Sequence, residues 1–177
     1  MENKESYGYA GRLTITLKRG GKVIRDPLTG RPRGVEGGIV LDKRVVKNTL
    51  LNTGRSYLIQ RIMDDGANVV SGTAVQCITV GTTTSAGSAG AGDTTATDVE
   101  VARENLTYAS GALGACSATA TFVSATANGA LTEAGLYAGV VGTSGDGVFF
   151  ARTMFAAVNK TSNDTLQIKW DVSFTGT

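Results

Sequence analysis

The chain contains no histidine. Without imidazole it has no Ser-His-Asp triad, no Cys-His nucleophile pair and no group that ordinarily titrates near neutral pH. Charged residues make up 18% of the sequence, below the globular average of roughly 25%. No apolar run approaches the roughly 20 residues that a membrane-spanning helix needs. These deficits point away from an enzyme or a membrane protein and toward a chain whose surface meets other proteins.

Cysteine is also scarce, because Cys77 and Cys116 are the only two. Both lie inside alternating apolar segments, so we expect two small core residues. A disulfide between neighbouring strands is the alternative. We expect no cofactor and no metal, because no phosphate-binding glycine loop or calcium-loop spacing occurs. The start of the chain, Met1 to Lys4, is not followed by an apolar segment, so we expect no export by a signal peptide.

Alternation of apolar and polar residues is the strongest pattern that is present. Residues 166–174 place Leu166, Ile168, Trp170, Val172 and Phe174 on one side of a strand and polar residues on the other. We expect further strands at 12–18, 22–25, 75–80, 99–106, 115–123, 130–138 and 148–155. This succession of strands and turns is typical of a mainly β fold, an antiparallel β-sandwich or jelly roll.

Two glycine turns predict hairpins. Gly20-Gly21 would join strands 12–18 and 22–25, and Asn128-Gly129 would join strands 115–123 and 130–138. The residues from 26 to 38 hold both prolines and are expected to form a loop.

One helix is expected, over about residues 42–63. Asp42 would cap it, and Val46 and Leu50 would belong to a broad apolar arc at helical spacing. Lys43 and Lys47 fall inside that arc and would have to snorkel or find an acidic partner. We expect this helix to pack on the sheet of a domain spanning 41–177. Residues 1–40 would form a separate N-terminal basic arm and hairpin.

Charge is unevenly distributed along the chain. Residues 1–62 hold thirteen Lys or Arg and five Asp or Glu, whereas residues 63–177 hold four and ten. A partner-docking surface is therefore expected at Lys18, Arg19, Lys22, Arg25, Arg31 and Arg33. It would meet an acidic protein, or the acidic part of another copy of the chain. Nucleic acid is the alternative partner, less favoured because only Tyr7 and Tyr9 offer nearby aromatic rings.

Glu133 and Arg152 lie in the middle of two successive predicted strands. If these strands pair, the two side chains face each other as an ion pair that fixes strand register. The alternative is a catalytic carboxylate beside an arginine. We favour the structural pair, because no second carboxylate stands at the spacing that glycosidases use.

Several short segments resemble one protein family. Residues 132–137 read Thr-Glu-Ala-Gly-Leu-Tyr, residues 151–155 read Ala-Arg-Thr-Met-Phe, and residues 160–170 read Lys-Thr-Ser-Asn-Asp-Thr-Leu-Gln-Ile-Lys-Trp. Upstream, residues 78–82 read Ile-Thr-Val-Gly-Thr and residues 100–103 read Glu-Val-Ala-Arg. Together they resemble a family of small structural proteins of tailed bacteriophages. The likeness covers roughly residues 45–175, and the first 40 residues have no counterpart in it.

This resemblance implies a non-enzymatic virion protein, assembled in the host cytoplasm. It would bind the capsid or the head-tail region (portal, neck or tail) as a decoration, cement or collar unit, and would form a homo-oligomer. A tail-fibre or baseplate β-domain for host attachment is the first alternative. A nucleic-acid-binding protein that uses the basic N-terminal region is the second. A sugar-cleaving tail enzyme is the least favoured, for lack of histidine and paired carboxylates.

Overall fold

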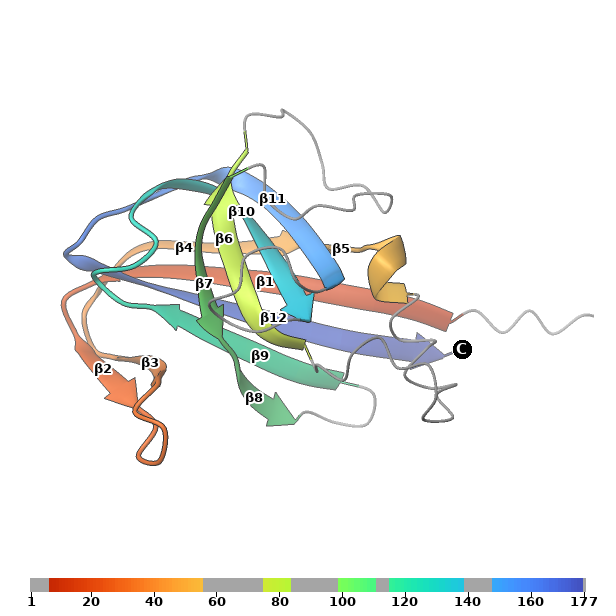
Figure 1. Ribbon diagram of the computed structural model, residues 1–177, viewed down its shortest axis with the longest axis horizontal. Helices are drawn as coiled ribbons and strands as arrows, with labels where there is room; N and C mark the ends of the chain where they lie inside the picture. The colour runs from red at the N-terminus through yellow and green to blue at the C-terminus, as the bar shows by residue number, and fades with distance from the viewer. Residues whose placement is uncertain (1–6, 56–74, 84–98, 111–114, 139–147, 177) are drawn as a thin grey trace, which may run out of the picture.

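A computed structural model describes residues 7–55, 75–83, 99–110, 115–138 and 148–176. These residues form twelve β-strands and the start of one helix (Figure 1). The strands make two five-stranded antiparallel sheets and one two-stranded ribbon. The predicted mainly β, sandwich-like fold is therefore confirmed.

The first sheet joins the two ends of the chain. Its order is β4 (Ile39–Lys47), β1 (Tyr7–Arg19), β12 (Asp164–Gly176), β9 (Ala115–Phe122) and β8 (Thr107–Ser110). β1 pairs with β12 without a register shift, from Tyr7 opposite Gly176 to Arg19 opposite Asp164. β1 is thus an inner strand of the sheet, with β4 on its other side. The interpretation of residues 7–19 as part of an arm and hairpin was wrong.

The second sheet runs in the order β5 (Thr49–Leu50), β11 (Val148–Lys160), β10 (Gly129–Ala138), β6 (Val75–Thr82) and β7 (Val99–Asn105). Its long strands cross those of the first sheet steeply in Figure 1. The ribbon pairs β2 (Lys22–Arg25) with β3 (Pro32–Glu36) and projects from one end of the molecule (Figure 1).

The hydrophobic core lies between the two sheets. The apolar row predicted for the last strand supplies part of it, because Leu166, Ile168, Trp170 and Val172 are all buried. Opposite side chains come from the inner face of the second sheet and include Ile78, Val80, Ala134 and Leu136. In these strands the alternation of apolar and polar residues therefore indicates which face of the strand is turned to the core.

Two continuous chain segments pass from one sheet to the other. β4 belongs to the first sheet, and after Asn48 the chain continues as β5 of the second. β7 belongs to the second sheet, and after Leu106 it continues as β8 of the first. At the first switch Asn48 N donates to Gly11 O (3.2 Å), and at the second Leu106 N donates to Gln76 O (2.9 Å). Strands that change sheets in this way form the corners of crossed sandwiches.

The helix begins later than predicted. Residues 42–47 belong to β4 and residues 49–50 to β5, whereas helical geometry starts at Asn52. In a helix Lys43 and Lys47 would fall on the apolar face. In the strand they lie on the exposed face, while Val46 packs against the core. Of the predicted helix, residues 56–63 lie outside the described residues.

The helical residues 52–55 pack against β11. Thr53 Oγ1 donates to Phe149 O at 2.7 Å, and a side chain at Gly54 would collide with the backbone of Phe150.

Both predicted hairpins were assigned the wrong partner strands. β2 pairs with β3 and not with β1, because both edges of β1 are occupied by β4 and β12. Part of the predicted loop at 26–38 is therefore strand β3. Likewise β9 and β10 lie in different sheets. The Asn128-Gly129 pair starts β10 after the chain has crossed from one sheet to the other.

The two cysteines occupy different environments and are not joined by a disulfide. Cys77 is buried on β6, as predicted, whereas Cys116 is exposed on β9, contrary to the prediction. Burial raises the pKa of the Cys77 thiol to about 11, against an opposing effect of the nearby Arg103 charge.

We expect the native protein to have one thiol that reacts rapidly with a disulfide reagent at mildly alkaline pH. Cys116 should react because it is exposed, while burial and the raised pKa keep Cys77 protonated and inaccessible. Titration of the native and the denatured protein would give one and two reactive thiols. Cys116→Ser should abolish the native signal, and two fast thiols in the native state would contradict this fold.

Candidate interaction surfaces

A buried ion pair lies on the second sheet, on the face opposite the core. Arg152 Nη2 donates to Glu133 Oε2 at 2.6 Å, and the side chains are 8% and 0% exposed. In the strand register Arg152 stands opposite Gly135 and Glu133 opposite Met154, so the contact runs diagonally between β10 and β11. The structure thus brings together the two residues that the sequence suggested as a register-fixing pair. Neither is accessible to a substrate from solvent.

The residues after Glu133 also serve packing. Ala134 and Leu136 enter the core between the sheets. A side chain at Gly135 would approach Phe149 Cε1 and Thr79 Oγ1 to 2.9 Å each. Tyr137 contacts the Phe149 ring at a centroid distance of 4.5 Å. Tyr137 also contacts Arg103, whose guanidinium carbon lies 4.1 Å from the centre of the Tyr137 ring. The residues of the segment Thr-Glu-Ala-Gly-Leu-Tyr are therefore explained by the packing of β10 against its neighbours.

A second buried charge cluster holds the turn between β11 and β12. Asp164, whose side chain is fully buried, accepts from Arg19 Nε at 2.8 Å and from Thr161 Oγ1 at 2.6 Å. Lys160 is 2% exposed, and its Nζ donates to Asn128 Oδ1 at 2.9 Å. The hydrogen bond from Arg19 is the main reason that the pKa of Asp164 falls to about 2, and Thr161 adds to it against the effect of burial. This cluster ties the start of β12 to the end of β1.

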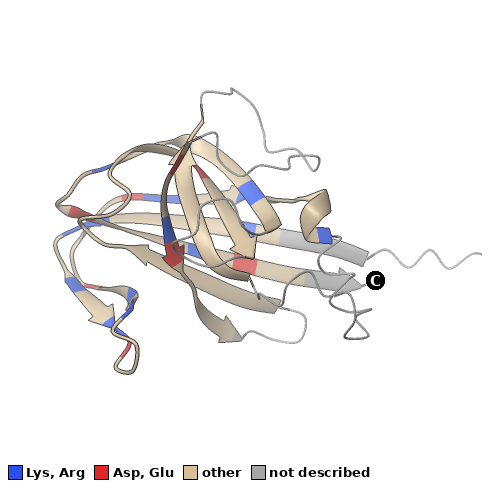
Figure 2. Cartoon of the chain, viewed as in Figure 1, with Lys and Arg blue, Asp and Glu red and all other residues tan. Residues whose placement is uncertain are grey.

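The six basic residues predicted to dock a partner divide into two groups. Arg19 is held by Asp164, Lys18 Nζ donates to Val35 O at 3.0 Å, and Arg33 lies 3.4 Å from Asp26 Oδ2. The remaining three have exposed side chains and lie on the ribbon, namely Lys22, Arg25 and Arg31. Figure 2 shows these positive charges along the projecting ribbon. Arg19 and Arg33 are also exposed in part, so five of the six predicted residues present charge to solvent, and several of them hold the ribbon or β1 in place as well.

The turn at the tip of the ribbon is held rigidly. Asp26 Oδ1 accepts from the backbone N–H groups of Leu28 and Thr29, each at 2.9 Å. Gly30 N donates to Asp26 O at 2.8 Å, and Arg25 Nη1 donates to Gly30 O at 2.9 Å. The backbone hydrogen bonds are the main cause of the lowered pKa of Asp26.

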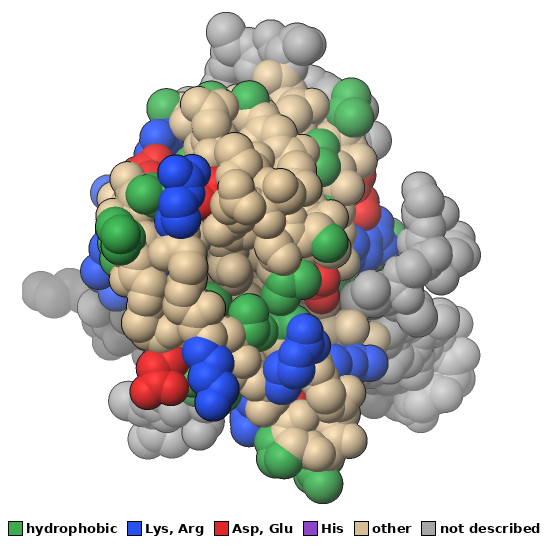
Figure 3. Space-filling view, turned by 90° about the vertical axis from the view of Figure 1, so that its left-hand side faces the viewer, with side chains coloured by type: hydrophobic (Ala, Val, Ile, Leu, Met, Phe, Trp, Pro, Cys, Tyr) green, Lys and Arg blue, Asp and Glu red, His purple; other side chains and the backbone are tan. Residues whose placement is uncertain are grey.

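This turn presents an apolar side chain to solvent. Leu28 is 94% exposed, which is the highest value among the exposed large hydrophobic residues described. In Figure 3 hydrophobic side chains lie at the end of the projecting lobe, next to several Lys and Arg side chains. An exposed apolar residue on a hydrogen-bonded turn and bordered by positive charge is suited to binding an acidic surface that has an apolar pocket.

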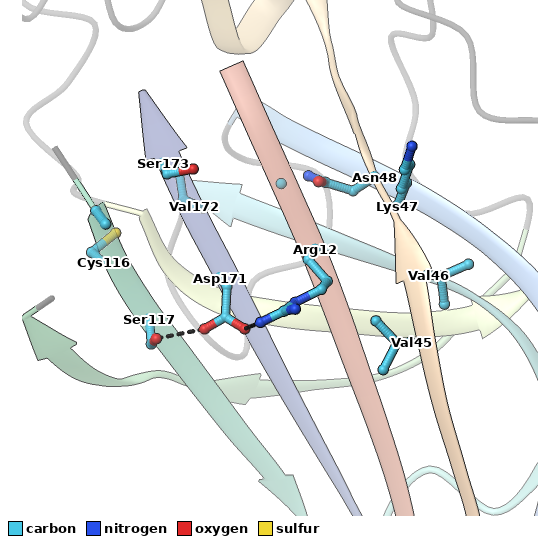
Figure 4. Close-up of a pocket in the computed structure, with 12 residues that line it drawn as sticks. Arg12, Val45, Val46, Lys47, Asn48, Cys116, Ser117, Asp171, Val172 and Ser173 are labelled. Carbon is cyan, nitrogen blue, oxygen red and sulfur yellow. Dashed lines mark hydrogen bonds and ion pairs between the residues drawn. The ribbon is translucent and has the colours of Figure 1, made fainter. Parts of the chain in front are cut away.

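A hollow of about 820 Å³ lies at the other end of the first sheet (Figure 4). Its lining comes from β1, β4, β9 and β12 and includes Arg12, Val45, Lys47, Ser117 and Asp171. Asp171 accepts from Ser117 Oγ at 2.6 Å and lies 3.5 Å from Arg12 Nη2, as the dashed lines in Figure 4 mark.

Asp171 is held as a carboxylate rather than as a proton donor. Lys169 Nζ lies 2.8 Å from its Oδ1. Burial by itself raises the pKa of Asp171, but the contacts with Lys169, Ser117 and Arg12 outweigh burial and leave the pKa below its ordinary value. A carboxylate that is saturated by donors is a poor general base. Among the lining residues described it is the only acidic one, so the hollow does not offer the carboxylate pair of a glycosidase.

Sequence reasoning placed Lys160, Asp164 and Arg103 in segments that carry the resemblance but gave them no structural role, and it gave none to Asp171. A signal existed for the turn, because the spacing Thr161-x-x-Asp164 suits a side-chain-bonded turn between two strands. Arg103 and Asp171 each have one charged partner nearby in sequence, Glu100 and Lys169. Their contacts with Tyr137 and Ser117 join strands far apart in sequence, and for these no local signal exists.

We expect Glu133→Ala to lower the free energy of unfolding by about 3–5 kcal/mol, because it leaves the buried Arg152 guanidinium without its carboxylate. The double variant Glu133→Leu/Arg152→Leu should recover most of this loss, since an apolar pair needs no compensation. Glu36→Ala, at an exposed position, is the control. Denaturant unfolding measures all three. A loss below about 1 kcal/mol for Glu133→Ala would contradict a structural role.

Asp164 should stabilise the fold only above acidic pH. Its folded-state pKa of about 2 lies below its ordinary value of 3.8, so the unfolded chain takes up the proton first as pH falls. The contribution is complete above the ordinary pKa and is lost between about pH 4 and 2. We therefore expect Asp164→Asn to be less stable than the wild type near neutral pH, with the difference shrinking over that interval. Urea titrations across this range test it, and a difference that stays constant with pH would refute it.

Comparisons with known proteins find no match. The chain matches no protein-family model, no curated protein and no solved structure at a significant level. In the described residues no helix is long and apolar enough to cross a membrane. The same residues contain no group of three or more His, Cys, Asp or Glu side chains placed to hold a metal ion. The assignment of a function therefore depends on the residues themselves.

Proposed function

We propose that this chain is a non-enzymatic structural protein of a bacteriophage virion, a decoration, cement or collar unit that binds the capsid or the head-tail region. One observation carries the proposal: the segments that resemble the phage family coincide with residues that build the sandwich. Glu133 and Arg152 form the ion pair between β10 and β11, and Lys160 and Asp164 hold the turn between β11 and β12. In such a family, what members share is a rigid building block.

The ribbon β2–β3 is the docking element in this proposal. It lies in the first 40 residues, for which the resemblance offers no counterpart, and unlike β1 it belongs to neither five-stranded sheet, so we treat it as an addition to the shared sandwich. Its exposed cations are Lys22, Arg25, Arg31 and Arg33, against one exposed acid, Glu36, and Leu28 stands at its tip. A partner that fits has carboxylates around an apolar pocket, and another virion protein is the partner that we propose. The hydrogen-bonded turn lowers the entropy cost of binding, because its backbone is already ordered before the partner arrives.

Nucleic acid is the second candidate partner, since the same exposed charges suit phosphate groups. The apolar tip favours a protein. A leucine that is 94% exposed contributes to binding when it enters an apolar pocket and gains little from a phosphate backbone. The two partners differ in salt dependence, which is steep for nucleic acid.

The substitutions Arg25→Gln/Arg31→Gln should weaken binding to particles assembled without this protein by roughly tenfold, because they remove two exposed charges from the docking element. Leu28→Ser should weaken binding without changing its salt dependence. Co-sedimentation of purified protein with such particles, at two salt concentrations, measures both effects. Each variant should retain the wild-type unfolding transition.

Arg12→Gln/Lys169→Gln is the matched control, because it removes the same charge from the face around Asp171. It should bind particles as the wild type does. Absence of the protein from purified virions would overturn the proposed function. Equal losses in the control and the ribbon variants would overturn the ribbon as the docking element. Binding to duplex DNA that falls steeply with salt, with no binding to particles, would establish the second candidate instead.

A further inference from the structure

Three consecutive apolar side chains are exposed at the start of β4. Ile39 is 70% exposed, Val40 51% and Leu41 43%. From Asp42 to Lys47 more and less exposed residues alternate along the strand, but the first three residues do not alternate. A run of three exposed apolar residues is unfavourable in water, and a folded protein keeps such a run where it serves a contact.

A β-bulge produces this run. Leu17 of β1 stands opposite Asp42. The next residue, Lys18, stands opposite Val40, so Leu41 is an extra residue on β4. The extra residue breaks the alternation that would otherwise turn every second side chain toward the core side. A bulge also discourages the pairing of a further strand along an edge. The start of β4 is therefore suited to contacts through side chains rather than to strand addition.

The run is continuous with the ribbon β2–β3. Two glycines separate the end of β3 from Ile39. Across the ladder, Val40 stands opposite Lys18, whose Nζ donates to Val35 O of the ribbon at 3.0 Å. In Figure 1 β4 begins at the end of the molecule from which the ribbon projects. The ribbon and the start of β4 therefore belong to the same end of the molecule.

The charge around the run has the same sign as that of the ribbon. Residues 18–44, which include the ribbon and the start of β4, hold eight Lys or Arg and three Asp or Glu. On β4 itself Asp42 lies 2.6 Å from Arg44 Nη2, so Lys43 is the excess charge there. Two copies that met through this same surface would oppose like charges. The complementary occupant is an acidic protein surface with apolar side chains, which is the partner proposed for the ribbon.

We propose that the run Ile39–Leu41 and the ribbon form one docking surface, which binds a single acidic virion protein. The run supplies the apolar contact, from which most of the affinity of an interface comes, and the cations of the ribbon supply orientation and a fast encounter. This inference rests on the proposed function and deepens it, because it extends the docking surface from the ribbon onto the sandwich.

The substitutions Ile39→Thr/Val40→Thr test the apolar contact. Threonine suits a strand and adds no charge, so the wild-type unfolding transition should be retained. Binding to particles assembled without this protein should weaken by roughly tenfold in co-sedimentation, with an unchanged salt dependence. Val99→Thr/Val101→Thr is the matched control, because it makes a similar change at exposed positions of β7, in the other sheet. The control should bind as the wild type does.

A cross-link identifies the occupant. In a Cys116→Ser background the buried Cys77 is the only native cysteine left, so a thiol reagent reacts with a cysteine introduced by Leu28→Cys or Leu41→Cys. A photoactivatable group attached at either position should capture the same virion protein from assembled particles. Capture of another copy of this chain from position 41 would overturn the proposal, as would capture of different proteins from the two positions.

The inference and the proposed function fail in different ways. If the ribbon variants lose binding while Ile39→Thr/Val40→Thr binds as the wild type does, the run is not part of the docking surface and the proposed function stands. Equal losses in Ile39→Thr/Val40→Thr and in the β7 control would also overturn the inference. Absence of the protein from purified virions would overturn the proposed function and this surface with it.

Discussion

The switch of two strands between the sheets is the constraint on which the rest of the structure depends. A sandwich of two sheets has four edges, and an unprotected edge is a site of uncontrolled pairing. Here the chain passes between the sheets at Asn48 and at Leu106. The segment through Asn48 supplies the edge strand β4 to the first sheet and β5 to the second, and the segment through Leu106 supplies β7 to the second sheet and β8 to the first. The corners close part of each edge. In the described part of the sandwich, the large hydrophobic residues that remain exposed lie on the strands of these two corner segments, on β4, β7 and β8.

The buried charges follow from the same arrangement. In a closed sandwich the faces and the turns must keep their register over long strands, because a slip of one residue would turn apolar side chains outward. Glu133 with Arg152 fixes β10 against β11, and Asp164 with Arg19 fixes the start of β12 against the end of β1. Such pairs add little net stability compared with apolar residues, but each is costly to break. They select one register.

The sequence allowed the fold class to be predicted, together with several strands and the Glu133–Arg152 pair, because alternation and charge are local signals. The strand partners could not be predicted. Gly20-Gly21 looks like a hairpin turn, but whether β2 returns to β1 depends on β4 and β12, which lie far away in sequence. Residues 42–50 were misread as helix because Val46 and Leu50 are also spaced by one helical turn. The two lysines inside the apolar arc were the conflicting signal, and the strand removes the conflict.

The small size of the docking ribbon has a physical consequence for binding. A single ribbon offers four exposed cations and the apolar side chains of Ile24 and Leu28, which is a small contact area for a protein interface. If copies assemble in a particle, each brings one ribbon, and a rigid sandwich holds all ribbons in a fixed relation. Contacts that are weak singly then act at a high effective concentration. This gain in affinity requires a rigid sandwich and a rigid turn around Asp26. If the ribbons were mobile, the entropy lost in ordering them on binding would offset much of the affinity gained from binding through several copies.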